Sequence, residues 1–157
     1  MTKTILGLDQ EYANDIALGL NELLASFQTY YQNLRGIHWN IKGKQFFELH
    51  VKFEELYTDA TIKVDELAER ILTLGGIPLH TFEDYQKQSK VVVGKDVTND
   101  EESVQLIVTS LSSLLVLERK LLNLSGDAND EGTNSLISDF VSEQEKTIWM
   151  MQSWLGN

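Results

Sequence analysis

The chain has 157 residues, a length that suits one folded unit with a substantial core. Its hydrophobic content of 42% excludes an intrinsically disordered protein, and its net charge of −11 argues against nucleic acid or an anionic membrane as a partner. The absence of cysteine excludes disulfides and thiolate metal sites, and a single proline favours long helices. We expect one domain over residues 1–157. Because the first residues contain no apolar run typical of a signal peptide and no segment is typical of a membrane span, we also expect a cytoplasmic protein.

The first predicted helix begins after Asp9, which has the side chain of an N-cap. His38 continues its core-facing row, and Trp39 follows directly. Asn40 to Gly43 is a short connection, so the first two helices form an antiparallel hairpin that folds His38 back towards His50. The apolar positions of this helix recur at helical spacing: Ala13, Ile16, Leu20, Leu23, Leu24, Phe27, Tyr31 and Leu34.

The second predicted helix, from Gly43 to Gly76, carries two separate pairs of metal-type side chains. Its apolar stripe includes Phe46, Leu49, Phe53, Tyr57, Ala60, Val64, Leu67, Ile71 and Leu74. His50 and Glu54 form one pair, and Asp65 and Glu69 form the other. At 100° per residue, all four side chains fall within one sector of roughly 100° on the helix surface.

These two pairs are too far apart to bind one ion within a single chain. Fifteen residues separate His50 from Asp65, which corresponds to about 22 Å along a helix. A site that uses both pairs therefore requires a second copy of this helix, running antiparallel. Glu66 and Arg70 are expected on the solvated side of the same helix.

The remaining elements complete an all-α four-helix bundle with one long crossover. That crossover extends from Gly75 to Asn99 and includes a short extra helix capped by Thr81, and Val91 to Val93 is expected to be a packed loop. The third long helix begins after a cap at Asn99 or Asp100. A polar turn over Ser125–Gly132 separates it from the fourth, which extends over about Asn134–Trp154.

Imidazole and carboxylate ligands together suit iron(II) and similar divalent ions, zinc included. The alternative interpretation of each residue is structural. A lone histidine on an apolar stripe is more often a hydrogen-bonded core residue, and Asp65 and Glu69 alone would be ordinary boundary charges. Trp39 alone would be an interface anchor, and His80 is expected at the surface.

The residues between positions 38 and 78 closely resemble the Dps family, the miniferritins named as DNA-binding proteins from starved cells. The helix pattern extends this resemblance over nearly the whole chain. The pattern consists of His38-Trp39, Lys42-Gly43, Phe46-Phe47, Leu49-His50, Asp65-Glu66, Ala68-Glu69-Arg70, Gly75-Gly76 and Pro78.

The resemblance implies a hollow dodecamer of ferritin-like subunits that oxidises iron(II), preferentially with hydrogen peroxide, and stores the ferric product. It implies a two-iron centre at a two-fold interface, with His38 and His50 from one subunit and Asp65 and Glu69 from its partner. Glu54 stands where many members have an acidic second-site ligand, commonly Asp. Trp39 resembles the aromatic residue beside the centre that intercepts radicals.

Acidic residues near the last turn and in the fourth helix match a second feature of the family. Members line ion pores at three-fold axes with acidic side chains, and the alternative is a solvated acidic turn. The corresponding residues here are Asp127, Asp130, Glu131 and Asp139.

Two functions from different classes follow from the resemblance. The first is a ferroxidase and iron store that protects the cell from oxidative damage. The second is a nucleoid protein that coats DNA with little ferroxidase role. The net charge of −11 and the absence of a basic cluster at either end of the chain favour the first.

Overall fold

The fold is known from a computed structural model, which describes residues 2–157. It consists of helices joined by short turns and one long connection. The helices are α1 (Gln10–Asn40), α2 (Phe46–Thr73), α3 (Phe82–Gln88), α4 (Asp100–Asp127) and α5 (Glu131–Leu155). None of them, within residues 2–157, combines the length and the apolar composition that crossing a membrane requires.

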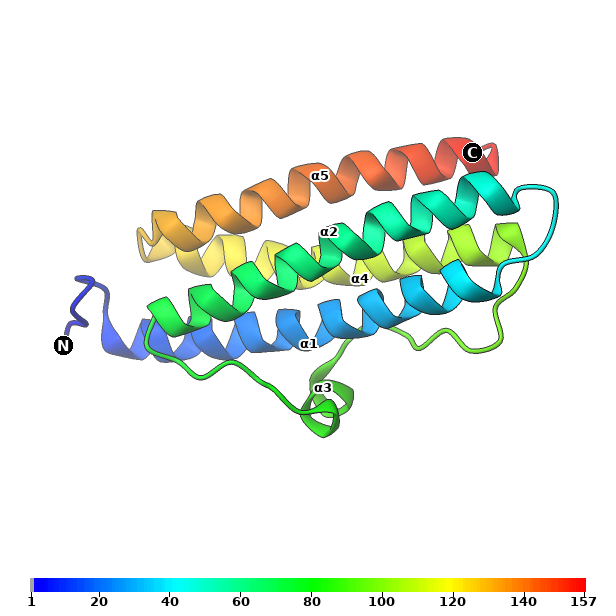
Figure 1. The fold of residues 1–157 in the computed structure, drawn as a ribbon. Coiled ribbons are helices and arrows are strands. Elements are labelled where there is room, and N and C mark those ends of the chain that lie inside the picture. Colours follow the sequence, from blue (N-terminus) through cyan, green and yellow to red (C-terminus); the bar gives the residue numbers. More distant parts are fainter. Residues whose placement is uncertain (1) are drawn as a thin grey trace.

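The four long helices lie side by side, and the crossover between α2 and α4 runs the length of the bundle (Figure 1). Helices α1 and α5 run in one direction, and α2 and α4 run in the other (Figure 1). α3 packs against α1 on the outside of the bundle (Figure 1). The predicted all-α four-helix bundle, with one long crossover and a short extra helix, is therefore confirmed.

The core forms because each long helix turns an apolar stripe towards the bundle axis. Phe27 of α1 and Phe53 of α2 are among its largest fully buried side chains. Phe27 meets Phe140 of α5 edge to face, with ring centroids 5.8 Å apart. These three buried aromatic rings come from three helices and fix how the helices pack. They therefore also fix the positions of the other side chains along the bundle axis.

The predicted helix caps are confirmed, while two helix starts differ from the prediction. The side chains of Asp9, Thr81 and Asn99 accept hydrogen bonds from the first turns of α1, α3 and α4. α2 begins at Phe46 and not at Gly43. α5 begins at Glu131, three residues before Asn134, because Asp130 is its N-cap. The prediction places Asp130 within the polar turn.

Two buried asparagines of α1 hold the crossover. Asn21 donates to the carbonyl of Ile77 (3.0 Å) and accepts from the amide of Leu79 (2.8 Å). Asn33 donates to the carbonyl of Val92 (2.8 Å) and accepts from the amide of Gly94 (2.9 Å). These bonds satisfy backbone groups of a segment that forms no strand within residues 2–157. The prediction of a packed loop over Val91–Val93 is correct only for Val91, which is buried, because Val92 and Val93 are 47% and 78% exposed.

Candidate metal centre

The hairpin of α1 and α2 brings the two predicted histidine ligands together. His38 lies near the end of α1 and His50 near the start of α2. Their rings are stacked, with centroids 3.7 Å apart and planes inclined by 12°. His38 is 7% exposed and His50 is half-buried, so the pair lies at the boundary between the core and the surface.

Each histidine is oriented by the backbone of the other. Nδ1 of His38 lies 2.7 Å from the carbonyl oxygen of His50, and Nδ1 of His50 lies 2.7 Å from the carbonyl oxygen of His38. Because a carbonyl only accepts, both Nδ1 atoms carry the proton and donate. In the neutral rings both Nε2 atoms then keep a lone pair, the form that binds metals.

Aromatic side chains fix the histidine pair in place. Phe46 stacks on His50, with centroids 4.9 Å apart, and Tyr57 meets His38 edge to face at 5.2 Å. The Arg35 guanidinium lies over the rings of Tyr57 (4.8 Å) and Trp39 (4.7 Å). Trp39 is 56% exposed, so this predicted neighbour of the centre is held at the surface by a cation–π contact.

The predicted carboxylate ligands lie on the exposed side of α2. Asp65 and Glu69 are exposed, and neither side chain has a hydrogen bond or an ion pair to another residue of the 2–157 range. Glu54 is also exposed and accepts from the hydroxyl of Tyr57 at 3.2 Å. Within residues 2–157, no three histidine, aspartate or glutamate side chains converge on one point. Within one chain, the two histidines therefore lie together at one place, and Asp65 and Glu69 lie further along α2.

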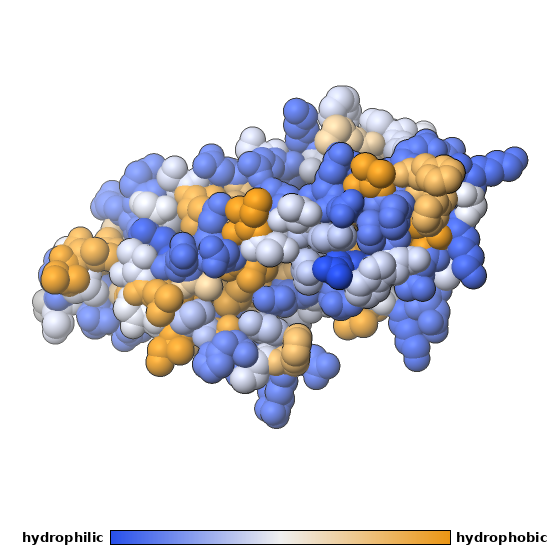
Figure 2. Space-filling model, viewed as in Figure 1, coloured by the Kyte–Doolittle hydropathy of each residue, from blue (hydrophilic) through white to orange (hydrophobic). Residues whose placement is uncertain are grey.

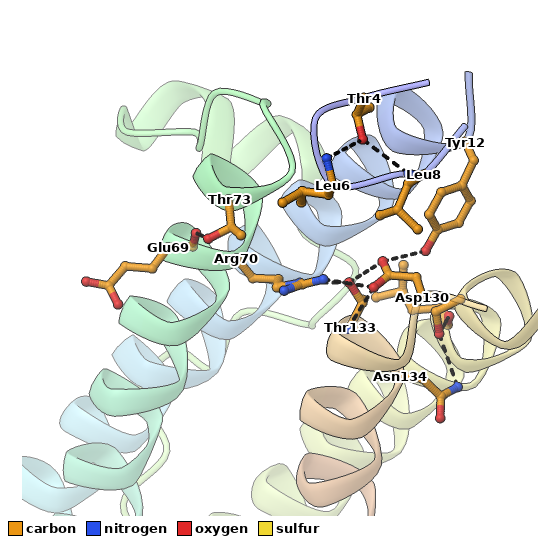
Figure 3. A network of polar contacts seen from close by, with 12 residues as sticks. Thr4, Leu6, Leu8, Tyr12, Glu69, Arg70, Thr73, Asp130, Thr133 and Asn134 are labelled. Atoms are coloured by element: carbon orange, nitrogen blue, oxygen red, sulfur yellow. Dashed lines mark hydrogen bonds and ion pairs between the residues drawn. The ribbon is translucent and has the colours of Figure 1, made fainter. Parts of the chain in front are cut away.

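The four predicted pore acids divide into two groups. Asp127, Glu131 and Asp139 are exposed, as a pore or a solvated turn requires. Asp130 is only 3% exposed, and its carboxylate is bound by Arg70, Tyr12 and Thr133 (Figure 3). The structure therefore contradicts the placement of Asp130 among the pore acids and gives it a role as a cap and an ion-pair partner.

The expectation that Arg70 lies on the solvated side of α2 is also wrong. Its side chain is 20% exposed and points to Asp130, with Nη2 2.8 Å from Oδ1. Burial opposes ionisation of Asp130, but hydrogen bonds from Thr133 and Tyr12 and the charge of Arg70 outweigh it and lower the pKa of this carboxyl below its usual range. The spacing of Arg70 from the apolar stripe gave no sign of this partner, which lies 60 residues away in sequence.

The bundle also buries two ionisable side chains whose burial the sequence did not predict. Lys63 of α2 is 4% exposed and donates to Asp59 and to Glu143, the latter at 2.6 Å. Glu118 of α4 is fully buried, and its carboxylate accepts from Nε2 of Gln144 at 2.6 Å. Burial raises the pKa of Glu118 to about 8, against the weaker opposing effects of Gln144 and Lys63.

Comparisons with known proteins agree with this architecture. Residues 17–157 match the family described as a ferritin-like domain. A Dps protein from Vibrio cholerae O1 has a crystal structure with a TM-score of 0.96 and 48% identity, covering 99% of this chain and 98% of that one. It is described as a member of a broad superfamily of ferritin-like diiron-carboxylate proteins.

Two curated relatives extend the likeness along the whole chain. An uncharacterized protein of Haemophilus influenzae is 47% identical over 153 residues, which are 98% of this chain and 96% of that protein. A DNA protection during starvation protein of Porphyromonas gingivalis is 39% identical over 150 residues, which are 96% of this chain and 94% of that protein.

Proposed function

The chain belongs to the Dps family of ferritin-like proteins, and from this premise we propose that it is a ferroxidase and iron store. Its substrate is iron(II), its preferred oxidant is hydrogen peroxide, and its product is a ferric mineral held inside a cytoplasmic dodecamer of single-domain subunits. By removing iron(II) and peroxide together, it protects the cell from oxidative damage.

The observation that carries this proposal is the histidine pair. Each of the two stacked imidazoles donates its Nδ1 proton to a backbone carbonyl and therefore keeps its lone pair on Nε2. A core histidine with only a structural role needs no second, parallel histidine held in the same tautomer. The donor set of imidazole and carboxylate oxygen also fits iron(II).

We propose that the centre is completed by a two-fold partner. His38 and His50 of one chain would face Asp65 and Glu69 of the partner subunit, and Glu54 would serve a second iron. His50, Asp65 and Glu69 lie on α2, and His38 lies beside His50 at the end of α1, so an antiparallel approach of two α2 helices would create two equivalent centres.

The proposed reaction needs two electrons and two protons for each peroxide. Two iron(II) ions give up one electron each, which reduces one hydrogen peroxide to two water molecules. The carboxylates of Asp65 and Glu69 compensate the charge that the irons gain, and the two histidines remain neutral ligands. Trp39 is the exposed aromatic side chain closest in sequence to His38 and would take up stray oxidising equivalents.

A DNA-coating role is the second candidate, because a relative is named for DNA protection. The net charge of −11 per chain opposes it, since repulsion from phosphate grows with each added subunit. The ferroxidase proposal explains the histidine pair, and the DNA-coating proposal does not.

Anaerobic addition of iron(II), followed by hydrogen peroxide, tests the proposed function. Ferric absorbance should rise rapidly in the assembled protein, and mass measurement should show a dodecamer. The His80→Ala variant removes an exposed histidine away from the centre and is expected to leave the rate unchanged. A wild-type rate equal to that of buffer alone would contradict the proposal.

A further inference from the structure

Glu69 and Arg70 are consecutive in α2 but point in opposite directions. Figure 3 shows the Glu69 side chain directed away from the bundle and the Arg70 side chain directed towards the start of α5. There Arg70 Nη2 donates to Asp130 (2.8 Å) and Nε donates to the hydroxyl of Thr133 (2.9 Å). A predicted metal ligand is thus adjacent to a side chain with two fixed partners.

Asp130 joins three helices at this point. Besides Arg70 of α2, its carboxylate accepts from the hydroxyl of Tyr12 in α1 (2.8 Å) and from the amide and hydroxyl of Thr133 in α5 (3.1 and 2.6 Å). Because Asp130 is only 3% exposed, these hydrogen bonds are shielded from water and hold their geometry better than a surface ion pair does.

The end of α2 needs such support, because α2 ends at Thr73, four residues after Glu69. Terminal helical turns lack part of their backbone hydrogen bonds and open most easily. Local hydrogen bonds satisfy part of this turn. The Thr73 hydroxyl donates to the carbonyl of Glu69 (2.8 Å), and the amide of Leu74 donates to the carbonyl of Arg70 (3.0 Å). The Glu69 carboxylate itself has no partner within residues 2–157, so its place relative to the bundle depends on the position of this helical turn.

We propose that Arg70 is a positioning residue for Glu69, and that its bonds to Asp130 and Thr133 fix the last turn of α2 so that the Glu69 carboxylate meets the metal in one orientation. This inference rests on the proposed function, because it assigns a support to one ligand of that centre. Asp65 lies one turn further from the helix end and depends less on this anchor.

Gly132 provides a way to move Arg70 without removing any charge. A Cβ atom at Gly132 would lie 2.8 Å from Nη2 and 2.9 Å from Nη1 of Arg70, so an alanine there must displace the guanidinium. Gly132 lies inside α5, where alanine favours the helix. The Gly132→Ala variant therefore shifts the guanidinium from its position beside Asp130 and Thr133 and keeps every charge of the site.

The test uses cobalt(II) as a redox-inert probe, titrated into the metal-free assembled protein and followed by visible absorbance and calorimetry. The His50→Ala variant identifies the signal that belongs to the centre. We expect the Arg70→Gln and Gly132→Ala variants to weaken cobalt(II) binding at that centre about tenfold. The Arg119→Gln variant, which removes an exposed ion pair to Glu145, is the matched control and should bind as the wild type does.

Double variants separate positioning from general loss of stability. The Arg70→Gln change should weaken binding again in an Asp65→Ala background but have no further effect in a Glu69→Ala background. Hydrogen exchange of the Leu74 and Gly76 amides should also be faster in the metal-free Arg70→Gln and Gly132→Ala variants.

Three outcomes overturn parts of the proposal in distinguishable ways. Wild-type cobalt(II) affinity in the Gly132→Ala variant contradicts the positioning role, and this variant decides the question if the Arg70→Gln variant does not assemble. An equal loss in the Glu69→Ala and Asp65→Ala backgrounds also contradicts it. Absence of a His50-dependent cobalt(II) signal in the wild type overturns the proposed metal centre, and the positioning role with it.

Discussion

The Glu118→Gln variant is expected to remove a large pH dependence from the free energy of unfolding. Glu118 is fully buried on α4, and its only hydrogen-bond donor within residues 2–157 is the Nε2 atom of Gln144. Oε1 of Gln144 is itself buried without a partner. A glutamine at position 118 keeps one acceptor for Gln144 Nε2 and adds an amide donor for that oxygen, so the change suits the site.

The magnitude follows from the raised pKa. Burial lifts the pKa of Glu118 from 4.5 to about 8, so between these pH values the folded chain keeps a proton that the unfolded chain has lost. Its contribution to stability is fully present below pH 4.5 and is lost as the pH rises to 8. At about 1.4 kcal/mol per pH unit, the loss is roughly 3 kcal/mol at pH 7 and about 4 kcal/mol at pH 8, where the folded-state group is itself half ionised.

Urea unfolding of wild type and Glu118→Gln, at equal protein concentration from pH 5 to 8, measures this effect. The advantage of the variant should grow steadily with pH, because contributions of all other groups cancel in the difference. The Glu145→Gln variant removes an exposed carboxylate of α5 and should keep the wild-type slope. Parallel stability curves for wild type and Glu118→Gln would refute the assignment of a protonated, buried Glu118.

Three further predictions concern assembly, DNA and the crossover. Light scattering combined with an oxidation assay should find ferroxidase activity only in assemblies of two or more chains, and a fully active monomer would contradict the shared centre. A gel-shift assay at neutral pH, moderate salt and without divalent cations should show no complex with DNA, because the chain carries a net charge of −11. The Asn33→Ala variant should lower the free energy of unfolding by about 2 kcal/mol, measured with urea, because it leaves two backbone groups of the crossover unpaired. An unchanged midpoint would show that water replaces both bonds.

The bundle was predictable from the sequence because its signals are local. Apolar residues at helical spacing define the long helices, and capping side chains such as Asp9 and Asn99 mark where two of them begin. The proximity of His38 and His50 also followed from a local feature, the short turn between their helices. Their tautomers did not, since the reciprocal bonds to backbone carbonyls depend on how the two helices pack.

The residues whose surroundings could not be predicted from the sequence each have a partner far away along the chain. Asp130 looked like one acid of a solvated turn, but Tyr12 and Arg70, 118 and 60 residues away in sequence, bind its carboxylate. Glu118 and Lys63 are charged residues of the kind that normally face water, and only the three-dimensional packing shows that they are buried. Periodicity assigns a face to each residue, but it does not identify a charge partner on another helix.

Mixing two inactive variants tests the shared centre most directly. His50→Ala and Asp65→Ala should each abolish rapid iron(II) oxidation, because each removes a different half of the same centre. After dissociation, mixing and reassembly, with exchange confirmed by mass spectrometry, random pairing makes about half of the dimers mixed, and one of the two centres in each mixed dimer is intact. The account predicts recovery of roughly a quarter of the wild-type activity. Confirmed exchange without any recovery would mean that each centre is built within one chain, against the arrangement proposed here.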